Sequence, residues 1–114
     1  MSRSYTLRFA QKHLQTWQYI KTGKKTVETR AATTKYLPIQ TGDTLIFSCA
    51  GKKFEKKIKK VTHVKTIAAL IKKYPPGVIN PGTTTLKEME TMYYSYPGYK
   101  EKIATCGILA FELE

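Results

Sequence analysis

The chain has 114 residues, which is enough for one domain with one modest hydrophobic core. Hydrophobic residues make up 41% of it, close to the norm for globular proteins, and this excludes a disordered chain. Twenty lysines and arginines against eight acids give a net charge of +12, which favours polyanionic partners.

Membrane and metal association are not expected. No stretch is long and apolar enough to span a bilayer, and the N-terminus lacks the apolar run of a secretory signal. Cys49 and Cys106 lie in apolar, strand-like runs without a CxxC pair, and His13 and His63 are scattered. We therefore expect a cytoplasmic protein with reduced, buried thiols, no zinc site, no cofactor and no membrane partner. His13 is more typical of a packed or solvated side chain than of a ligand.

The first elements along the chain are a strand and a helix. Tyr5–Phe9 alternates apolar and polar residues and predicts a strand. The segment from Gln11 to Lys21 predicts a helix, because Leu14, Trp17 and Ile20 recur every three residues. Gly23 closes this helix, since glycine adopts the left-handed conformation of a helix end.

The segment Thr26–Arg30 predicts a short strand with an unusual face. Glu28 and Arg30 are two residues apart, so both leave the same side of the strand, whereas Val27 points to the core. Three lysines precede this strand: Lys21, Lys24 and Lys25. The pattern indicates either a cationic cleft with a carboxylate at its floor or an ordinary ion pair on a solvated strand.

The middle of the chain predicts a loop and a buried strand. Residues 31–38 have no clear period, and they hold polar groups that could border the cleft: Thr33, Thr34, Lys35 and Tyr36. Asp43 belongs to a turn and is interpreted as a turn-capping acid. Thr44–Cys49 predicts a strand buried on both faces or nearly so, and Gly51 marks a hairpin turn.

The second strand of that hairpin, from Phe54 to Val64, requires an irregularity. Phe54 and Ile58 share one parity and Val61 has the other, so we expect a bulge near Lys59 and Lys60. Lysines crowd the hairpin at positions 52, 53, 56, 57, 59 and 60. They protect a solvated edge or form a phosphate-contacting rim, and the charge of the whole chain favours the rim.

The C-terminal half predicts two helices and a closing strand. Thr66 caps a helix with an apolar stripe from Ile67 to Tyr74, and Pro75–Gly77 ends it. Thr85 and Glu88 fit a capping box that opens a second short helix. The four tyrosines of residues 93–99 pack a helix against a sheet or, less favoured, stack bases. Residues 106–114 predict the last strand.

Strands mostly not separated by helices predict an α+β fold, a small mixed barrel of about five to six strands with flanking helices.

The run Ile20–Arg30 resembles the GxKxxExR signature of the ASCH domain. The Gly42-Asp43 turn, the Tyr96-Pro97-Gly98 segment and the strand at 107–110 fall where that family has similar features. The resemblance covers essentially the whole chain and implies one domain, residues 1–114. It also implies a PUA-like β-barrel, a cleft beside the motif and a role in RNA biology.

One bacterial branch of the family resembles an amidohydrolase of acylated cytidine. Its lysine and arginine map to Lys25 and Arg30, but its threonine falls at Glu28. Its distant glutamate falls around residues 78–81, where this chain has no acid. A ribonuclease activity also occurs within the family, but it cannot be assigned to particular residues of this chain by position.

Two functional hypotheses follow, with protein recruitment by the barrel as a third. In the binding hypothesis, a phosphate or base of RNA or of a nucleotide is held by Lys21, Lys24, Lys25, Arg30, Lys35, Tyr36, Lys56, Lys59 and Tyr96. Glu28 then orients Arg30 or accepts a hydrogen bond from an amino group of the base. In the hydrolase hypothesis, the catalytic residues are Lys25, Glu28 and Arg30, with Glu28 as general base. Because nearby lysines lower the pKa of Glu28 and weaken it as a base, binding is favoured.

Overall fold

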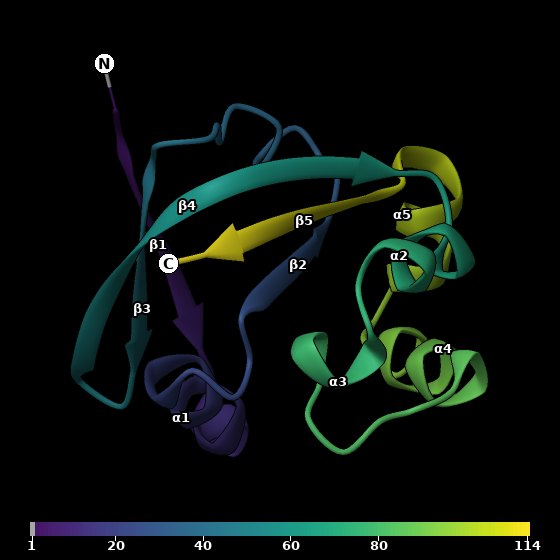
Figure 1. Cartoon of the computed structure of the whole chain (residues 1–114), viewed down its shortest axis with the longest axis horizontal. Coiled ribbons are helices and arrows are strands. Elements are labelled where there is room, and N and C mark those ends of the chain that lie inside the picture. The colour runs from purple at the N-terminus through teal and green to yellow at the C-terminus, as the bar shows by residue number, and fades with distance from the viewer. Residues whose placement is uncertain (1) are drawn as a thin grey trace.

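A curled sheet forms one side of the molecule and a group of short helices forms the other (Figure 1). The structure, a computed structural model, describes residues 2–114. The strands are β1 (Ser4–Phe9), β2 (Val27–Ala31), β3 (Thr44–Cys49), β4 (Lys52–Val64) and β5 (Ile108–Leu113). The helices are a 3₁₀ turn (Gln11–His13), α1 (Leu14–Thr22), α2 (Ile67–Lys73), α3 (Pro76–Ile79), α4 (Leu86–Tyr94) and α5 (Tyr99–Cys106).

The long strand β4 curls the sheet into a half-barrel. The strand order is β1-β3-β4-β5-β2, in which β1 pairs with β3 in parallel and the other pairs are antiparallel. β4 pairs first with β3 and then with β5, and its register shifts between Ile58 and Lys60, which confirms the expected bulge. The curl brings the two edge strands together, so that the Arg30 guanidinium of β2 lies 5.5 Å from the Phe9 ring of β1.

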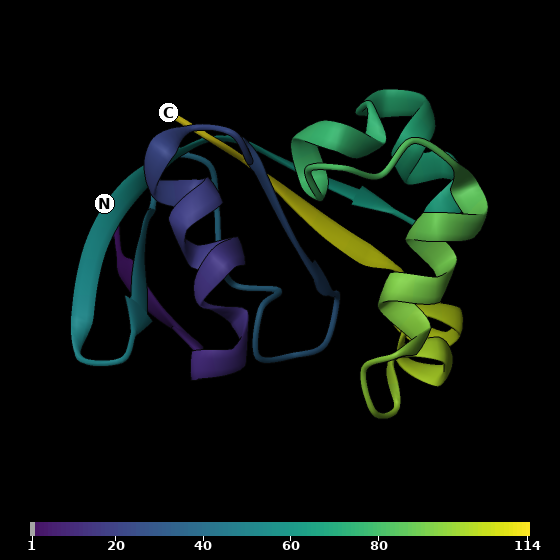
Figure 2. The same ribbon diagram turned by 90° about the horizontal axis from the view of Figure 1, so that it is seen from below.

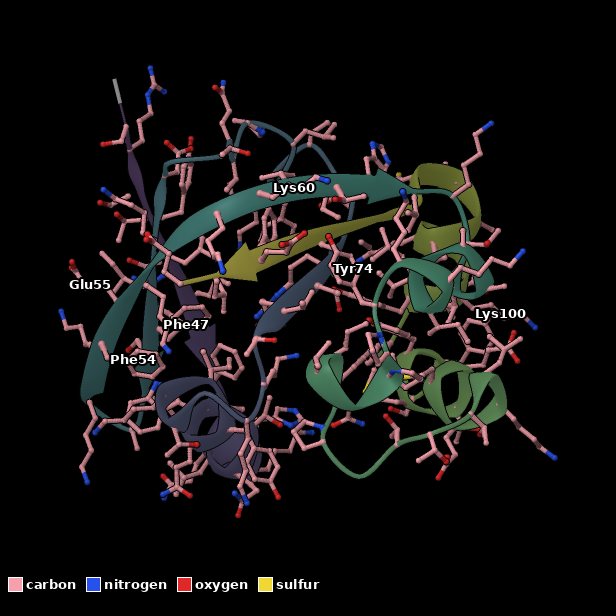
Figure 3. The ribbon with its side chains drawn as sticks, viewed as in Figure 1. Phe47, Phe54, Glu55, Lys60, Tyr74 and Lys100 are labelled. Atoms are coloured by element: carbon pink, nitrogen blue, oxygen red, sulfur yellow. The ribbon has the colours of Figure 1, made fainter. Side chains whose placement is uncertain are left out.

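Two hydrophobic cores pack on the two faces of the sheet. Leu109 and Phe111 of β5 point into the first core, which α1 covers from below (Figure 2). There Trp17 donates a hydrogen bond to the carbonyl of Phe47. Phe47 and Phe54 lie side by side (Figure 3), and their rings are stacked with centroids 5.2 Å apart. Ile108 and Ala110 point into the second core, under α2, α4 and α5, together with Val27. The core position expected for Val27 is confirmed.

Several local predictions are confirmed at the ends of elements. α1 ends at Gly23 with φ of 85°, in the left-handed region. Thr66 accepts a hydrogen bond from the Ala69 N–H at the start of α2, and Thr85 with Glu88 forms a capping box at α4. Asp43 accepts hydrogen bonds from the backbone N–H groups of Arg3 and Gln40, which confirms its role in the turn.

Two expectations for the helical half were wrong. Residues 76–79, expected only to break a helix, form the single turn α3, because proline fits the first position of a helix. Tyr99–Cys106 forms the unpredicted helix α5, so Cys106 ends a helix and the last strand begins at Ile108. β3 has one buried face, formed by Leu45, Phe47 and Cys49, and its other face is half-buried, close to the near-complete burial that we expected.

None of the helices in residues 2–114 is both long enough and apolar enough to cross a bilayer.

Candidate functional site

A cavity of about 370 Å³ lies where the edge strands of the half-barrel meet the helical half. Its sheet side is lined by Arg8, Phe9, Lys25, Glu28, Thr29 and Arg30. Its helical side is lined by Ile79, Asn80, Met92, Tyr93, Tyr96 and Tyr99. The signature strand β2 therefore faces a hollow bordered by both halves of the molecule.

Strand β2 is positioned by the turn that follows α1. The Lys25 N–H donates to the carbonyl of Tyr19 and the Thr26 N–H donates to that of Val78, both at 3.0 Å. β2 pairs only with β5 in the sheet, so its other edge is open. On that edge the Thr29 N–H donates to Glu28 Oε1 at 2.9 Å and the Ala31 N–H donates to the Tyr99 hydroxyl at 3.4 Å. Side chains thus accept hydrogen bonds from two backbone N–H groups of this edge, which would otherwise be free to pair with another strand.

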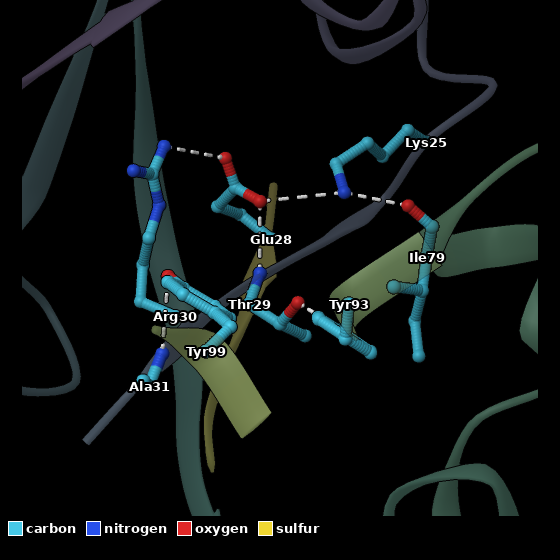
Figure 4. A network of polar contacts seen from close by, with 8 residues as sticks. All are labelled: Lys25, Glu28, Thr29, Arg30, Ala31, Ile79, Tyr93 and Tyr99. Carbon is cyan, nitrogen blue, oxygen red and sulfur yellow. Dashed lines mark hydrogen bonds and ion pairs between the residues drawn. The ribbon is translucent and has the colours of Figure 1, made fainter. Parts of the chain in front are cut away.

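Glu28 is the centre of a buried polar network (Figure 4). Its side chain lies 3.3 Å from Lys25 Nζ through Oε1 and 3.3 Å from an Arg30 guanidinium nitrogen through Oε2. Lys25 Nζ also donates to the carbonyl of Ile79 at 2.5 Å. Glu28 is 4% exposed and Lys25 is 5% exposed. The arrangement is a buried carboxylate between two cations rather than an ion pair on a solvated strand.

The charges of the network decide the protonation state of Glu28. Burial alone would raise the pKa of its carboxyl, but Lys25, Arg30 and the Thr29 N–H stabilise the anion and hold the pKa below its ordinary value of 4.5. Glu28 is therefore ionised at neutral pH. One carboxylate and two cations leave the cavity floor with a net positive charge, as the cleft hypothesis predicts.

Two aromatic rings hold the guanidinium of Arg30. Its central carbon lies 5.5 Å from the Phe9 ring centroid and 5.7 Å from that of Tyr36, within the range of cation–π interaction. A single hydrogen bond to Glu28 occupies one guanidinium nitrogen. The rest of the planar fork can donate to a phosphate or to a base.

The tyrosines form the wall of the cavity opposite β2. The hydroxyls of Tyr93 and Thr29 are hydrogen-bonded, and the rings of Tyr93 and Tyr99 are stacked with centroids 6.4 Å apart. Tyr93 is buried in the second core, and burial raises the pKa of its phenol. The predicted packing role is confirmed for Tyr93. Tyr96 is 36% exposed and packs edge-on against Tyr99 at 5.5 Å, so it also presents a ring to the cavity.

The structure brings four of the predicted site residues together in the cavity lining: Lys25, Glu28, Arg30 and Tyr96. Tyr36 supports Arg30 from outside the lining. Lys21, Lys24 and Lys35 are exposed outside it, with their ammonium groups 5.4–5.6 Å from the rings of Trp17, Tyr19 and Tyr36. Lys56 and Lys59 lie on β4, also outside the lining. Their contact with a ligand stays a prediction.

Sequence reasoning missed several residues of the lining. Arg8 comes from the opposite edge strand, and neither it nor Met92 belongs to a motif. Asn80 lies in the range 78–81, where the family resemblance places a fourth functional group, and this was the one available signal. His13 also lines the cavity, half-buried and 6.0 Å from the Tyr96 ring, which agrees with the packed interpretation.

The described residues, 2–114, contain no group of three or more histidine, cysteine, aspartate or glutamate side chains that could hold a metal ion.

Comparison with known proteins identifies the family. The family model described as the ASCH domain matches residues 13–114, nearly the whole chain. The chain belongs to the ASCH domain family. In this ASCH domain, the signature positions Lys25, Glu28 and Arg30 form the buried network at the cavity floor.

Two solved structures share the fold of this ASCH domain. The crystal structure of hypothetical protein PH0355 superposes with a TM-score of 0.80 and 26% identity, over 100% of this chain and 98% of that one. The solution structure of protein PF0455 from Pyrococcus furiosus superposes with a TM-score of 0.75 and 22% identity, over 97% and 96%. A search of curated proteins found no match. These likenesses confirm the α+β, barrel-like fold expected from the sequence.

Proposed function

We propose that this ASCH domain binds single-stranded RNA and that one nucleotide enters the cavity. The observation that carries the proposal is the buried Lys25–Glu28–Arg30 network, which faces a hollow walled by tyrosine rings. Cationic side chains attract phosphates, and exposed aromatic rings stack unpaired bases. A net charge of +12 supplies the long-range attraction for a polyanion.

The size of the cavity favours a single unstacked nucleotide. A volume of about 370 Å³ lies within the usual range of small-ligand sites, about 300–1,000 Å³. A duplex is far wider than such a hollow, whereas sequence-specific RNA recognition mostly uses unpaired bases.

The same geometry disfavours the hydrolase alternative. Glu28 already accepts from Lys25, Arg30 and the Thr29 N–H, and its lowered pKa makes it a weak general base. Lys25 is held between Glu28 and the carbonyl of Ile79, so its side-chain nitrogen is already engaged by two groups of the protein.

The proposal is tested by titrating labelled single-stranded RNA, duplex RNA and an uncharged nucleoside with the protein at about 50 and 200 mM salt. We expect single-stranded RNA to bind most tightly and its affinity to fall steeply with salt, because phosphate contacts release counterions. Fluorescence anisotropy measures the RNA complexes and calorimetry measures the nucleoside. RNA affinity that is independent of salt would overturn the proposal.

A pair of matched variants locates the binding site. Arg30→Gln removes a cation from the cavity, whereas Lys87→Gln removes one from the exposed face of α4. We expect Arg30→Gln to weaken RNA binding by at least tenfold, the usual effect of losing a charge-assisted contact of about 1.4 kcal/mol. Equal losses in the two variants would place the binding outside the cavity.

A further inference from the structure

We propose that Arg8 and Arg30 hold one phosphate group of the bound nucleotide between the two edge strands of the half-barrel. This role rests on the proposed RNA-binding function, and it makes Arg8 a phosphate-binding residue outside the signature motif. Both arginines line the cavity.

The cations of the cavity lining differ in how much hydrogen-bonding capacity the protein leaves them. Lys25 contacts both Glu28 and a backbone carbonyl. Arg30 donates one hydrogen bond, to Glu28, and keeps the rest of its N–H donors. Within residues 2–114, the side chain of Arg8 forms neither an ion pair nor a hydrogen bond. The two arginines therefore retain the donors that a bound anion needs.

Arg8 and Arg30 come from opposite edges of the sheet. β1 and β2 lie at the two ends of the strand order. The ring of Phe9, the next residue after Arg8, packs on the guanidinium of Arg30, with 5.5 Å between the ring centroid and the central carbon. Because consecutive Cα atoms are about 3.8 Å apart, Arg8 enters the lining one residue from this contact. A ligand group at the seam between the two strands is thus within reach of both.

The two arginines differ in depth. Successive side chains of a strand leave opposite faces, so Arg8 points away from the first core, against which Leu7 and Phe9 pack. Arg8 is exposed, whereas Arg30 is half-buried beside two aromatic rings. A phosphate between them therefore lies at the rim of the cavity, where its remaining oxygens stay in water. The base can then extend inward, toward the tyrosine wall.

The charge of the lining suits a phosphate. Glu28 offsets one of its two neighbours, Lys25 and Arg30, and Arg8 adds a further positive charge. A phosphodiester carries one negative charge, and a terminal phosphate carries nearly two at neutral pH. The planar fork of a guanidinium matches the oxygens of either kind. Both kinds of phosphate are therefore compared in the test.

The test measures how much a phosphate contributes to binding. The probes are adenosine, adenosine 5′-monophosphate and the dinucleotide adenylyl-adenosine, which carry no phosphate, a terminal phosphate and an internal phosphate. NMR titrations at constant ionic strength give their dissociation constants. We expect the wild type to bind at least one phosphate-bearing probe roughly tenfold or more tightly than adenosine, the usual effect of a charge-assisted contact. The probe that gains affinity identifies the kind of phosphate that is held.

Two arginine variants locate the phosphate. Arg8→Gln should lose most of the phosphate advantage and keep the affinity for adenosine. The matched control is Arg3→Gln, which removes the same charge from an exposed residue before β1, outside the cavity lining, and should keep the advantage. With single-stranded RNA, Arg8→Gln should likewise weaken binding more than Arg3→Gln does. The double variant Arg8→Gln, Arg30→Gln should lose less than the two single losses multiplied, because both arginines bind the same group.

The outcomes separate this role from the function on which it rests. RNA binding that Arg8→Gln and Arg3→Gln weaken equally, or no advantage of either phosphate-bearing probe, overturns the role of Arg8 and leaves RNA binding standing. Single losses that multiply in the double variant overturn the shared phosphate. A wild type that binds adenosine 5′-monophosphate through Arg8 but binds no RNA overturns the proposed function alone, and one that binds neither overturns both. Thermal unfolding verifies that each variant is folded at the assay temperature.

Discussion

Glu28 links the stability of the domain to pH. Its carboxyl is buried, yet Lys25, Arg30 and the Thr29 N–H hold its pKa below the ordinary value of 4.5. The unfolded chain therefore binds this proton more tightly than the folded one does. The stabilising effect is complete above about pH 4.5 and is lost as pH falls through the folded-state pKa.

Replacing Glu28 by glutamine should remove this part of the pH dependence. We expect Glu28→Gln to be less stable than the wild type at neutral pH, because the buried Lys25 and the half-buried Arg30 lose their counter-charge. The difference should shrink as pH falls below about 4.5. Thermal unfolding followed by circular dichroism between about pH 7 and pH 3 measures it. The exposed Glu101→Gln serves as control, and an equal change in both variants would contradict the assignment.

At the residue scale, the sequence predicts only the part of the site that lies within one strand. Glu28 and Arg30 share a face because the strand repeat is two residues, and Lys25 lies just before them. Asn80, directly after α3, and Arg8, on the opposite edge strand, reach the same cavity from about 50 and 20 residues away along the chain. Tertiary packing alone brings them to Glu28, and no local pattern marks them.

At the element scale, Gly107 joins α5 to β5 in a single residue. Its φ and ψ are 81° and −164°, a region that is essentially restricted to glycine. A Cβ atom there would lie 2.4 Å from the carbonyl oxygen of Val64 and 3.0 Å from His63 Nε2. His63 Nε2 is itself hydrogen-bonded to the carbonyl of Cys106 at 2.8 Å. The strand and the helix end are therefore packed without room for a side chain.

Gly107→Ala should destabilise the domain by roughly 3–5 kcal/mol, because backbone strain and a clash with backbone act together. Gly82→Ala is the matched control, since Gly82 also has a positive φ, of 94°, but open space around it. The control should lose only about 1–2 kcal/mol. Denaturant unfolding of both variants measures the two decreases in unfolding free energy. If Gly107→Ala loses no more stability than Gly82→Ala, the contact with Val64 relaxes easily.

The elements that the sequence predicts well are those with strong local patterns. The bulge near Lys59 follows from the change of parity along β4, and the ends of α1 and α4 follow from Gly23 and from the Thr85 capping box. α5 was missed because only Tyr99 and Ile103 mark its buried side and Pro97-Gly98 precede it. The parallel pairing of β1 with β3 leaves no signal within either strand.

At the scale of the whole molecule, most of the positive charge is available to a partner. The two ion pairs within residues 2–114 both involve Glu28. The lysines of the β3–β4 hairpin, including Lys60 on the surface of β4 (Figure 3), therefore form no ion pair within that range. They could extend the binding surface beyond the cavity, as the predicted roles of Lys56 and Lys59 require.

The double variant Lys56→Gln, Lys59→Gln tests this extension. If both lysines contact phosphates, the slope of log affinity against log salt should decrease by about 1.4, since each contact contributes about 0.7 with single strands. The control is Lys72→Gln, Lys73→Gln, which removes the same charge from the exposed end of α2. Titration of single-stranded RNA over a range of salt measures both slopes. Equal slopes in the two double variants would assign the hairpin lysines to general attraction only.

The pairing of β2 with β5 has a consequence for synthesis on the ribosome. β2 has a single neighbour in the sheet of residues 2–114, and that neighbour, β5, is the last of its five strands in chain order. Residues 27–31 therefore leave the ribosome long before their partner, residues 108–113, and at roughly 5–20 residues per second the interval lasts several seconds. During that time we expect the Lys25–Glu28–Arg30 group to remain in contact with water. A nascent chain that stalls before residue 108 should consequently lack the cavity, however much of the N-terminal half has already folded.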